Sequence, residues 1–166
     1  MDRPSNVVHV DQVAWKDTAR GDRYGWRRKQ LGAAAGGVKI GCSLFELPPG
    51  RRSYPYHYHC ANEEAIYVLE GSGALRLPGG EITIGPGDYA ALPATPEGAH
   101  QVVNTSNVPL RYLCISTMLE PDLSVYPDSG KVGFFAGSAP GGPQESRSVA
   151  GYVRLESRVG YWDGED

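Results

Sequence analysis

Short apolar runs separated by glycine and proline are the feature that most limits what this chain can fold into. The 166 residues include 22 glycines and 13 prolines. They divide the apolar residues into short runs, a pattern that favours strands and tight turns over helices. The chain is long enough for one hydrophobic core. The sequence therefore predicts an all-β fold, a sandwich or a barrel, built around a single core.

Eight runs in the middle of the chain are expected to form strands, with turns between them. The runs span residues 38–47, 54–59, 65–69, 74–77, 81–84, 89–92, 100–104 and 110–117. Residues 7–10 are expected to form one more short strand near the N-terminus.

Charge and composition exclude several classes of partner. The net charge of −3 offers no general attraction to nucleic acid or to an acidic membrane. No apolar run is long enough to cross a bilayer, and the first residues lack the basic and apolar segments of a signal peptide. We therefore expect a cytoplasmic protein with neither nucleic acid nor membrane as a partner. Three cysteines without regular spacing argue against a disulfide framework.

Two histidines two residues apart, His57 and His59, lie in a run expected to be a strand. Alternate residues of a strand project from one face, so both imidazoles can reach one metal ion. The next run begins with Glu63 and Glu64, and a carboxylate from an antiparallel neighbour can complete such a site. Both glutamates share strand parity with apolar residues, so parity leaves the choice between them open. A third histidine, His100, can join only through tertiary folding.

Two longer patterns resemble the paired sequence motifs of the cupin superfamily. The first pattern contains Gly50, His57, His59, Glu64 and Gly71. The second contains Gly87, Pro93, Gly98, His100 and Asn104. The gaps before His57, between Pro93 and Gly98, and before His100 each differ slightly from the family's common spacing. The spacing from Glu64 to Gly71 is what selects Glu64, rather than Glu63, as the family's carboxylate ligand.

The resemblance implies a fold, a ligand set and an assembly. The fold is a double-stranded β-helix, or jelly-roll barrel, over residues 38–117. Residues 1–37 form an N-terminal extension that packs on the barrel, and residues 118–166 form a C-terminal arm. The resemblance also implies a homodimer that binds a small molecule. The implied metal ligands are His57, His59, Glu64 and His100, while Gly71, Pro93, Gly98 and Asn104 shape the backbone.

Three imidazoles and one carboxylate leave two adjacent positions free in an octahedral coordination sphere. Iron, manganese, nickel and cobalt, all divalent, fit that geometry. Zinc prefers four-coordinate sites, so the same four ligands would nearly fill its coordination sphere. The affinity of such ligands for zinc does not exclude it. We expect one divalent transition metal, without a choice among these five.

A metal-dependent enzyme that acts on a small organic molecule is the expected function, with a dioxygenase-type oxidoreductase as the first subclass. The alternative is an isomerase or lyase of a sugar-like or hydroxy-acid substrate, with Glu63 or a barrel tyrosine as general base. A non-catalytic binder or sensor of a small ligand is a further alternative.

Aromatic residues raise two more expectations. Tyr54, Tyr56 and Tyr58 alternate with the histidines, so a regular strand would point them away from the metal, against the N-terminal extension or a partner subunit. The tail segments 126–132 and 161–165 resemble those of a group of functionally uncharacterised bacterial single-domain cupins. The tail is expected to be a strap that packs on the barrel, with a lid as the alternative.

Overall fold

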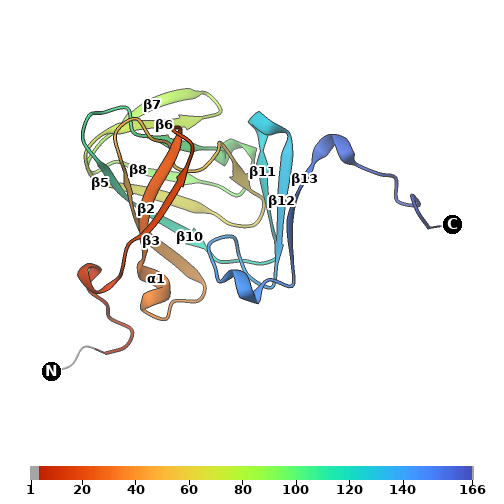
Figure 1. Ribbon diagram of the computed structural model, residues 1–166, viewed down its shortest axis with the longest axis horizontal. Helices are drawn as coiled ribbons and strands as arrows, with labels where there is room; N and C mark the ends of the chain where they lie inside the picture. Colours follow the sequence, from red (N-terminus) through yellow and green to blue (C-terminus); the bar gives the residue numbers. More distant parts are fainter. Residues whose placement is uncertain (1–3, 166) are drawn as a thin grey trace.

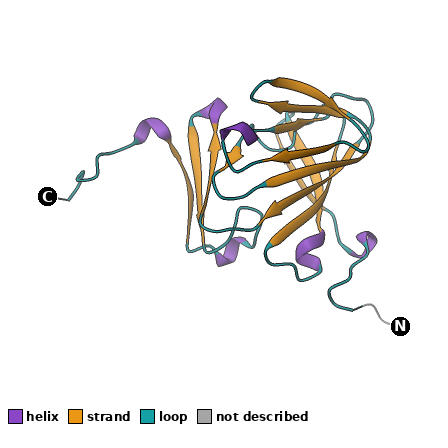
Figure 2. Cartoon of the chain, turned by 180° about the vertical axis from the view of Figure 1, so that it is seen from behind, coloured by secondary structure: helices purple, strands orange, loops and turns teal. Residues whose placement is uncertain are grey.

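Antiparallel strands are the main regular structure of the described chain, which confirms the all-β prediction. The computed structural model describes residues 4–165. Two facing sheets form a jelly roll, and a third sheet stands beside them (Figures 1 and 2). The described α-structure is limited to one short helix, α1 (Leu31–Ala34), and no helix in that part of the chain is long and apolar enough to cross a membrane.

The first sheet has six strands. In spatial order they are β1 (Lys16–Arg20), β2 (Tyr24–Gln30), β3 (Ile40–Leu47), β10 (Leu110–Thr117), β5 (Glu64–Glu70) and β8 (Tyr89–Leu92). Strands β1 and β2 form a hairpin whose second strand pairs with β3. The N-terminal segment thus extends the sheet, although its polar sequence carries no clear strand period.

The strand expected at residues 7–10 is absent from its predicted position. A 3₁₀ turn, η1 (Val10–Gln12), begins there instead. The ring of His9 accepts a hydrogen bond from the backbone of Asp11, and the Gln12 side chain accepts one from the backbone of His9. These local side-chain bonds offer the backbone an alternative to a sheet ladder.

The second sheet has three strands, β7 (Gly80–Ile84), β6 (Gly73–Leu77) and β9 (Gln101–Val103). The hydrophobic core lies between this sheet and the first one. Its fully buried members come from both sheets and are Leu47, Val68, Leu75, Val102 and Leu110. Along β5 the buried Ile66 and Val68 alternate with the exposed Tyr67 and Leu69, as expected for a two-layer β fold.

The third sheet is built mainly from the C-terminal arm. Its order is β13 (Val149–Arg154), β12 (Lys131–Ala136), β11 (Asp122–Tyr126) and β4 (Tyr58–His59). The run predicted at residues 54–59 is therefore a strand only at its last two residues, and its partner is the tail. In Figure 1 this sheet stands beside the jelly roll, and the chain beyond β13 extends away from it.

Residues assigned backbone-shaping roles occupy crowded positions. Gly71 has a φ of 75°, and a side chain there would collide with the Pro109 carbonyl oxygen. Gly98 is packed against the backbone of Pro93. The buried amide of Asn104 donates to the carbonyl oxygens of Leu47 and Val108, both at 2.8 Å.

Candidate metal centre

Backbone pairing brings the three histidines of the site together. His59 belongs to β4, which pairs with β11. His57 forms an isolated antiparallel bridge with His100, in which each backbone N–H donates to the other residue's carbonyl oxygen. Residues that face each other in such a bridge carry their side chains on the same side. The two imidazole rings accordingly lie 4.9 Å apart between centroids.

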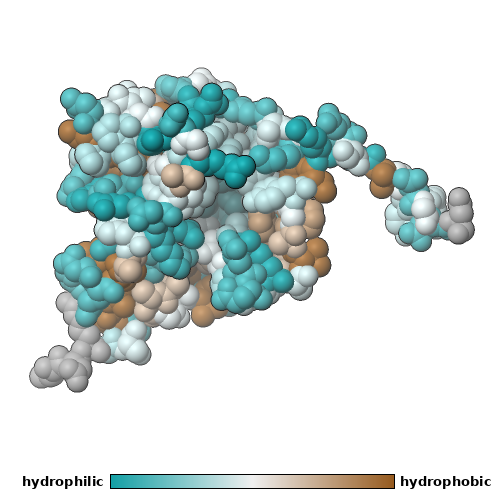
Figure 3. All heavy atoms as spheres, viewed as in Figure 1, coloured by the Kyte–Doolittle hydropathy of each residue, from teal (hydrophilic) through white to brown (hydrophobic). Residues whose placement is uncertain are grey.

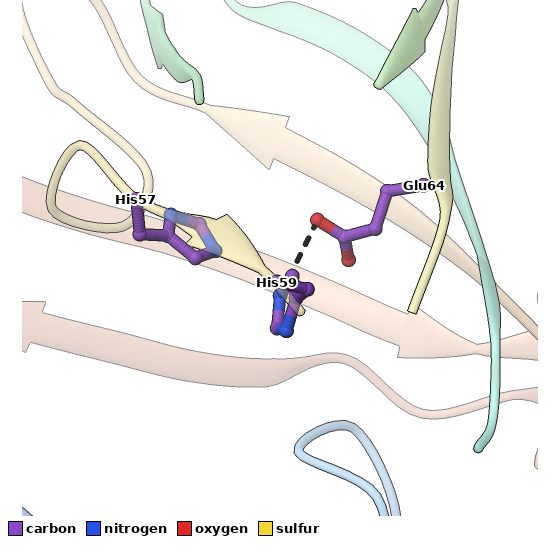
Figure 4. A group of neighbouring side chains, drawn as sticks. All are labelled: His57, His59 and Glu64. Carbon is purple, nitrogen blue, oxygen red and sulfur yellow. Dashed lines mark ion pairs between the residues drawn. The ribbon is translucent and has the colours of Figure 1, made fainter. Parts of the chain in front are cut away.

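Glu64 opens β5 and directs its carboxylate at the ring of His59 (Figure 4). His57, His59 and Glu64 each place a ligand atom within 4.8 Å of the other two. Oε2 of Glu64 lies 3.6 Å from Nε2 of His59 and 3.3 Å from Nε2 of His100. The three histidines are buried. Residues distant in sequence thus converge on one small interior volume.

The other nitrogen of each imidazole is engaged on the side away from this volume. Nδ1 of His57 lies 2.8 Å from the Pro55 carbonyl oxygen, and Nδ1 of His100 lies 2.9 Å from the Gly98 carbonyl oxygen. A carbonyl only accepts, so Nδ1 is the donor in both bonds. Nδ1 of His59 lies 2.6 Å from Oδ2 of Asp122. Nε2 of His57 and His100 therefore keeps its lone pair, as a metal ligand requires.

For His57 and Glu64 the electrostatics favour the protonation states that bind metal. Burial lowers the pKa of His57 to about 3, and the neighbouring His100 adds to this effect. Burial by itself would raise the pKa of Glu64, but hydrogen bonding to His100 and the surrounding imidazoles lower it to about 2. At neutral pH the residues present a neutral imidazole and a carboxylate. This donor set suits a divalent transition metal.

The structure also separates the two adjacent glutamates. Glu64 shares its face of β5 with the buried Ile66 and Val68. Glu63 is exposed, and no metal-binding group among the described residues includes it. It therefore lies outside the site and is poorly placed to act as a base there.

The C-terminal arm contributes two residues that the motifs did not single out, Asp122 and Ser124, and also Tyr126, which belongs to the segment considered as a lid. The carboxylate of Asp122 is fully buried and bonds both to His59 and, through Oδ1 at 2.9 Å, to the backbone N–H of Ala61. Ser124 Oγ lies 3.2 Å from Nδ1 of His59. The ring of Tyr126 stacks on His57 at 5.6 Å between centroids. Their spacing of two residues indicates that they share one face of a strand. Only the pairing of β11 with β4 shows that this face lies toward His59.

Tyr54 does not point away from the site as a regular strand would require. Its ring packs against Trp26 of the N-terminal segment, at 4.5 Å between centroids, and also approaches His57 at 6.1 Å. The prediction was wrong about direction because residues 54–57 do not form a regular strand. Tyr56, in contrast, lies under the guanidinium of Arg76.

The fold and the buried histidine–carboxylate group define a jelly roll with a candidate metal site, and comparisons with known proteins agree with that fold. The sequence model of the Cupin domain matches residues 43–116. A candidate sugar phosphate isomerase from Acidithiobacillus ferrooxidans superposes with a TM-score of 0.79 and 25% identity, over 93% of this chain and 96% of that one. A cupin-superfamily sugar phosphate isomerase from Silicibacter pomeroyi gives 0.78 and 26%, over 95% and 98%.

A protein of Methanocaldococcus jannaschii is 35% identical over 80 residues. That match covers 48% of this chain and 62% of the relative, so it spans less than two thirds of the relative's length. The family match thus identifies residues 43–116 as a cupin domain, and the superposed structures share the cupin fold over nearly the whole chain.

Proposed function

We propose that this cupin is a metal-dependent isomerase of a sugar-like, phosphorylated substrate. The convergence of buried imidazoles and a carboxylate supports the metal. Likeness over nearly the whole chain to two proteins described as sugar phosphate isomerases supports the reaction class. We therefore favour an isomerase over the dioxygenase expected from the sequence, because none of the described residues of the site indicates dioxygen chemistry in particular.

The proposed ligands are His57, His59, Glu64 and His100. Bound there, a divalent iron, manganese, nickel, cobalt or zinc ion would supply Lewis acidity toward the substrate's oxygen atoms. A metal held by these residues would bind a carbonyl oxygen and a neighbouring hydroxyl oxygen of the substrate. These are the two groups that an aldose–ketose isomerase interchanges between adjacent carbons.

Two tyrosines beside His57 are suited to donate hydrogen bonds to the substrate. Burial raises the pKa of Tyr54 to about 12, and it also raises the pKa of Tyr126. Both hydroxyls therefore stay protonated at neutral pH and act as donors. Tyr126 also covers one face of His57, which limits access of water to that side of the site.

The test combines metal analysis with isotope exchange. Protein purified without a histidine tag is assayed for metal, reloaded with each candidate ion, and incubated in D2O with aldose and ketose phosphates. We expect deuterium at the carbon next to the carbonyl, detected by NMR. His57→Ala should lose both metal and exchange, whereas His9→Ala, at an exposed histidine outside the site, should retain both.

Other outcomes identify the alternatives. Oxygen uptake by the iron-loaded protein, without exchange, would replace the isomerase with a dioxygenase. Saturable binding of small molecules without turnover by any loaded form would indicate a binder or sensor. If both His57→Ala and His100→Ala kept their metal, the ligand set itself would be refuted.

The proposal includes a homodimer formed through the outer face of the six-stranded sheet. Apolar side chains on that face are exposed, among them Ile40, Tyr67, Leu69 and Tyr89. Tyr67 and Tyr89 lie opposite each other on paired strands. Contiguous exposed apolar area of this kind marks association surfaces. Sedimentation velocity should give a dimer that Tyr67→Lys dissociates, and a monomeric wild-type protein would contradict this part of the proposal.

A further inference from the structure

Strand β2 carries cationic side chains on both of its faces. Arg27 binds Glu46 on the outer face, with Nε 2.7 Å from Oε1. Arg28 lies directly opposite Phe45 in the pairing of β2 with β3. Phe45 belongs to the buried core, and paired residues share a face. The side chain of Arg28 therefore lies on the core-facing side of β2. Trp26, two residues earlier, lies on the same side.

Two hydrogen-bond donors on this inner face lack acceptors among residues 4–165. No ion pair or hydrogen bond joins Arg28 to another described side chain or carbonyl. Nε1 of Trp26 is buried and unpartnered. The ring of Tyr54 packs on Trp26. Buried donors without acceptors are costly, and a guanidinium and an indole can only donate.

Charge around Arg28 is also left unbalanced. Lys16 of β1 lies directly opposite it and takes part in no ion pair within the described chain. Like charges across a strand pair repel. An anion bound between β2 and Tyr54 would remove the repulsion and give Arg28 and Trp26 an acceptor.

This cluster lies next to the metal centre. Arg28 faces Phe45 across β2 and β3, and the Phe45 ring lies 6.1 Å from the Tyr54 ring between centroids. Trp26, Tyr54 and Cys114 all pack against the same core cluster. Sγ of Cys114 is 3.9 Å from Oε1 of Glu64, and the Tyr54 ring contacts both Trp26 and His57. Figure 3 shows the surface hollowed between the jelly roll and the C-terminal sheet.

We propose that Trp26, Arg28 and Tyr54 form an oxyanion subsite that binds the phosphate of the substrate while its sugar oxygens face the metal ligands. Arginine suits this role because its planar donors match phosphate oxygens in pairs. The inference rests on the proposed function for the identity of the substrate, but the subsite itself can be measured without metal or turnover.

Calorimetric titration of metal-free protein with inorganic phosphate tests the subsite. We expect saturable binding that Arg28→Gln weakens about tenfold or more, equivalent to about 1.4 kcal/mol. Arg28→Lys should restore part of the affinity, because it returns the charge without the paired donors. Trp26→Phe keeps the ring, removes the N–H, and should weaken binding less. Arg27→Gln is the matched control on the outer face of the same strand and should bind phosphate like the wild type.

A second set of titrations, on metal-loaded protein, separates phosphate from carboxylate. Ribose 5-phosphate should lose affinity in Arg28→Gln, whereas unphosphorylated ribose should not. A loss confined to ribonate would overturn the phosphate assignment. Equal phosphate affinity in Arg28→Gln and wild type, with melting temperatures unchanged, would overturn the subsite. Failure of deuterium exchange with phosphate binding intact would instead refute only the isomerase.

Discussion

Replacing Asp122 by asparagine should weaken metal binding although Asp122 is not a proposed ligand. Its two oxygens accept hydrogen bonds from different donors, His59 Nδ1 at 2.6 Å and the Ala61 N–H at 2.9 Å. An asparagine has only one acceptor oxygen. If that oxygen faces Ala61, the amide N–H₂ faces His59 and forces the tautomer that carries its proton on Nε2, which cannot bind metal.

The opposite orientation of the amide carries a similar cost. Its N–H₂ would then face the N–H of Ala61, leaving two buried donors against each other at about 1–3 kcal/mol. Either arrangement predicts a fall in metal affinity of about 10- to 100-fold, the range typical of residues that orient a ligand. The side chain is fully buried, so solvent cannot repair the loss.

Competition with a chromophoric chelator, using cobalt or zinc, gives the affinity directly. Asp128→Asn is the matched control, because Asp128 lies in the same arm but pairs with Arg76 at an exposed position. It should bind metal like the wild type. Unchanged affinity in Asp122→Asn, or an equal fall in both variants, would refute the argument that Asp122 fixes the tautomer of His59.

Three further predictions follow from the same contacts. Glu64→Gln should lower the metal content strongly, whereas Glu63→Gln should leave it unchanged, because only Glu64 faces the imidazoles. Elemental analysis measures both, and the reverse order would show that Glu63 is the ligand instead. Asn104→Ala should destabilise the fold by about 1–3 kcal/mol in urea unfolding, because it strips buried carbonyls of their donor; unchanged stability would contradict this. Truncation after Leu119 should lower the melting temperature and the metal affinity together, because it removes β11 and the partner of His59; unchanged stability with altered ligand binding would favour a lid.

Local pattern determined much of the fold. Strands β3, β5, β8 and β10 lie within a few residues of the runs expected from the sequence. Alternation of apolar and polar residues defines the buried face of a strand without knowledge of its neighbours, as Ile66 and Val68 illustrate. Turn residues bound each run for local steric reasons. The hairpin of β1 and β2 escaped detection because β1 is exposed along its length and so has no apolar period.

The sequence by itself determined that His57 and His59 lie close together, and its motif spacing singled out Glu64 and His100. What only the tertiary structure decided is the surroundings of those residues. Asp122 lies 63 residues from His59 in the chain, and no local rule relates the two. Arg28 lies on the core-facing side of β2 because β2 pairs with β3 in one particular register. Contacts of this kind depend on which strands pair and in what register, and that choice is made by the packing of the whole core rather than by any single segment.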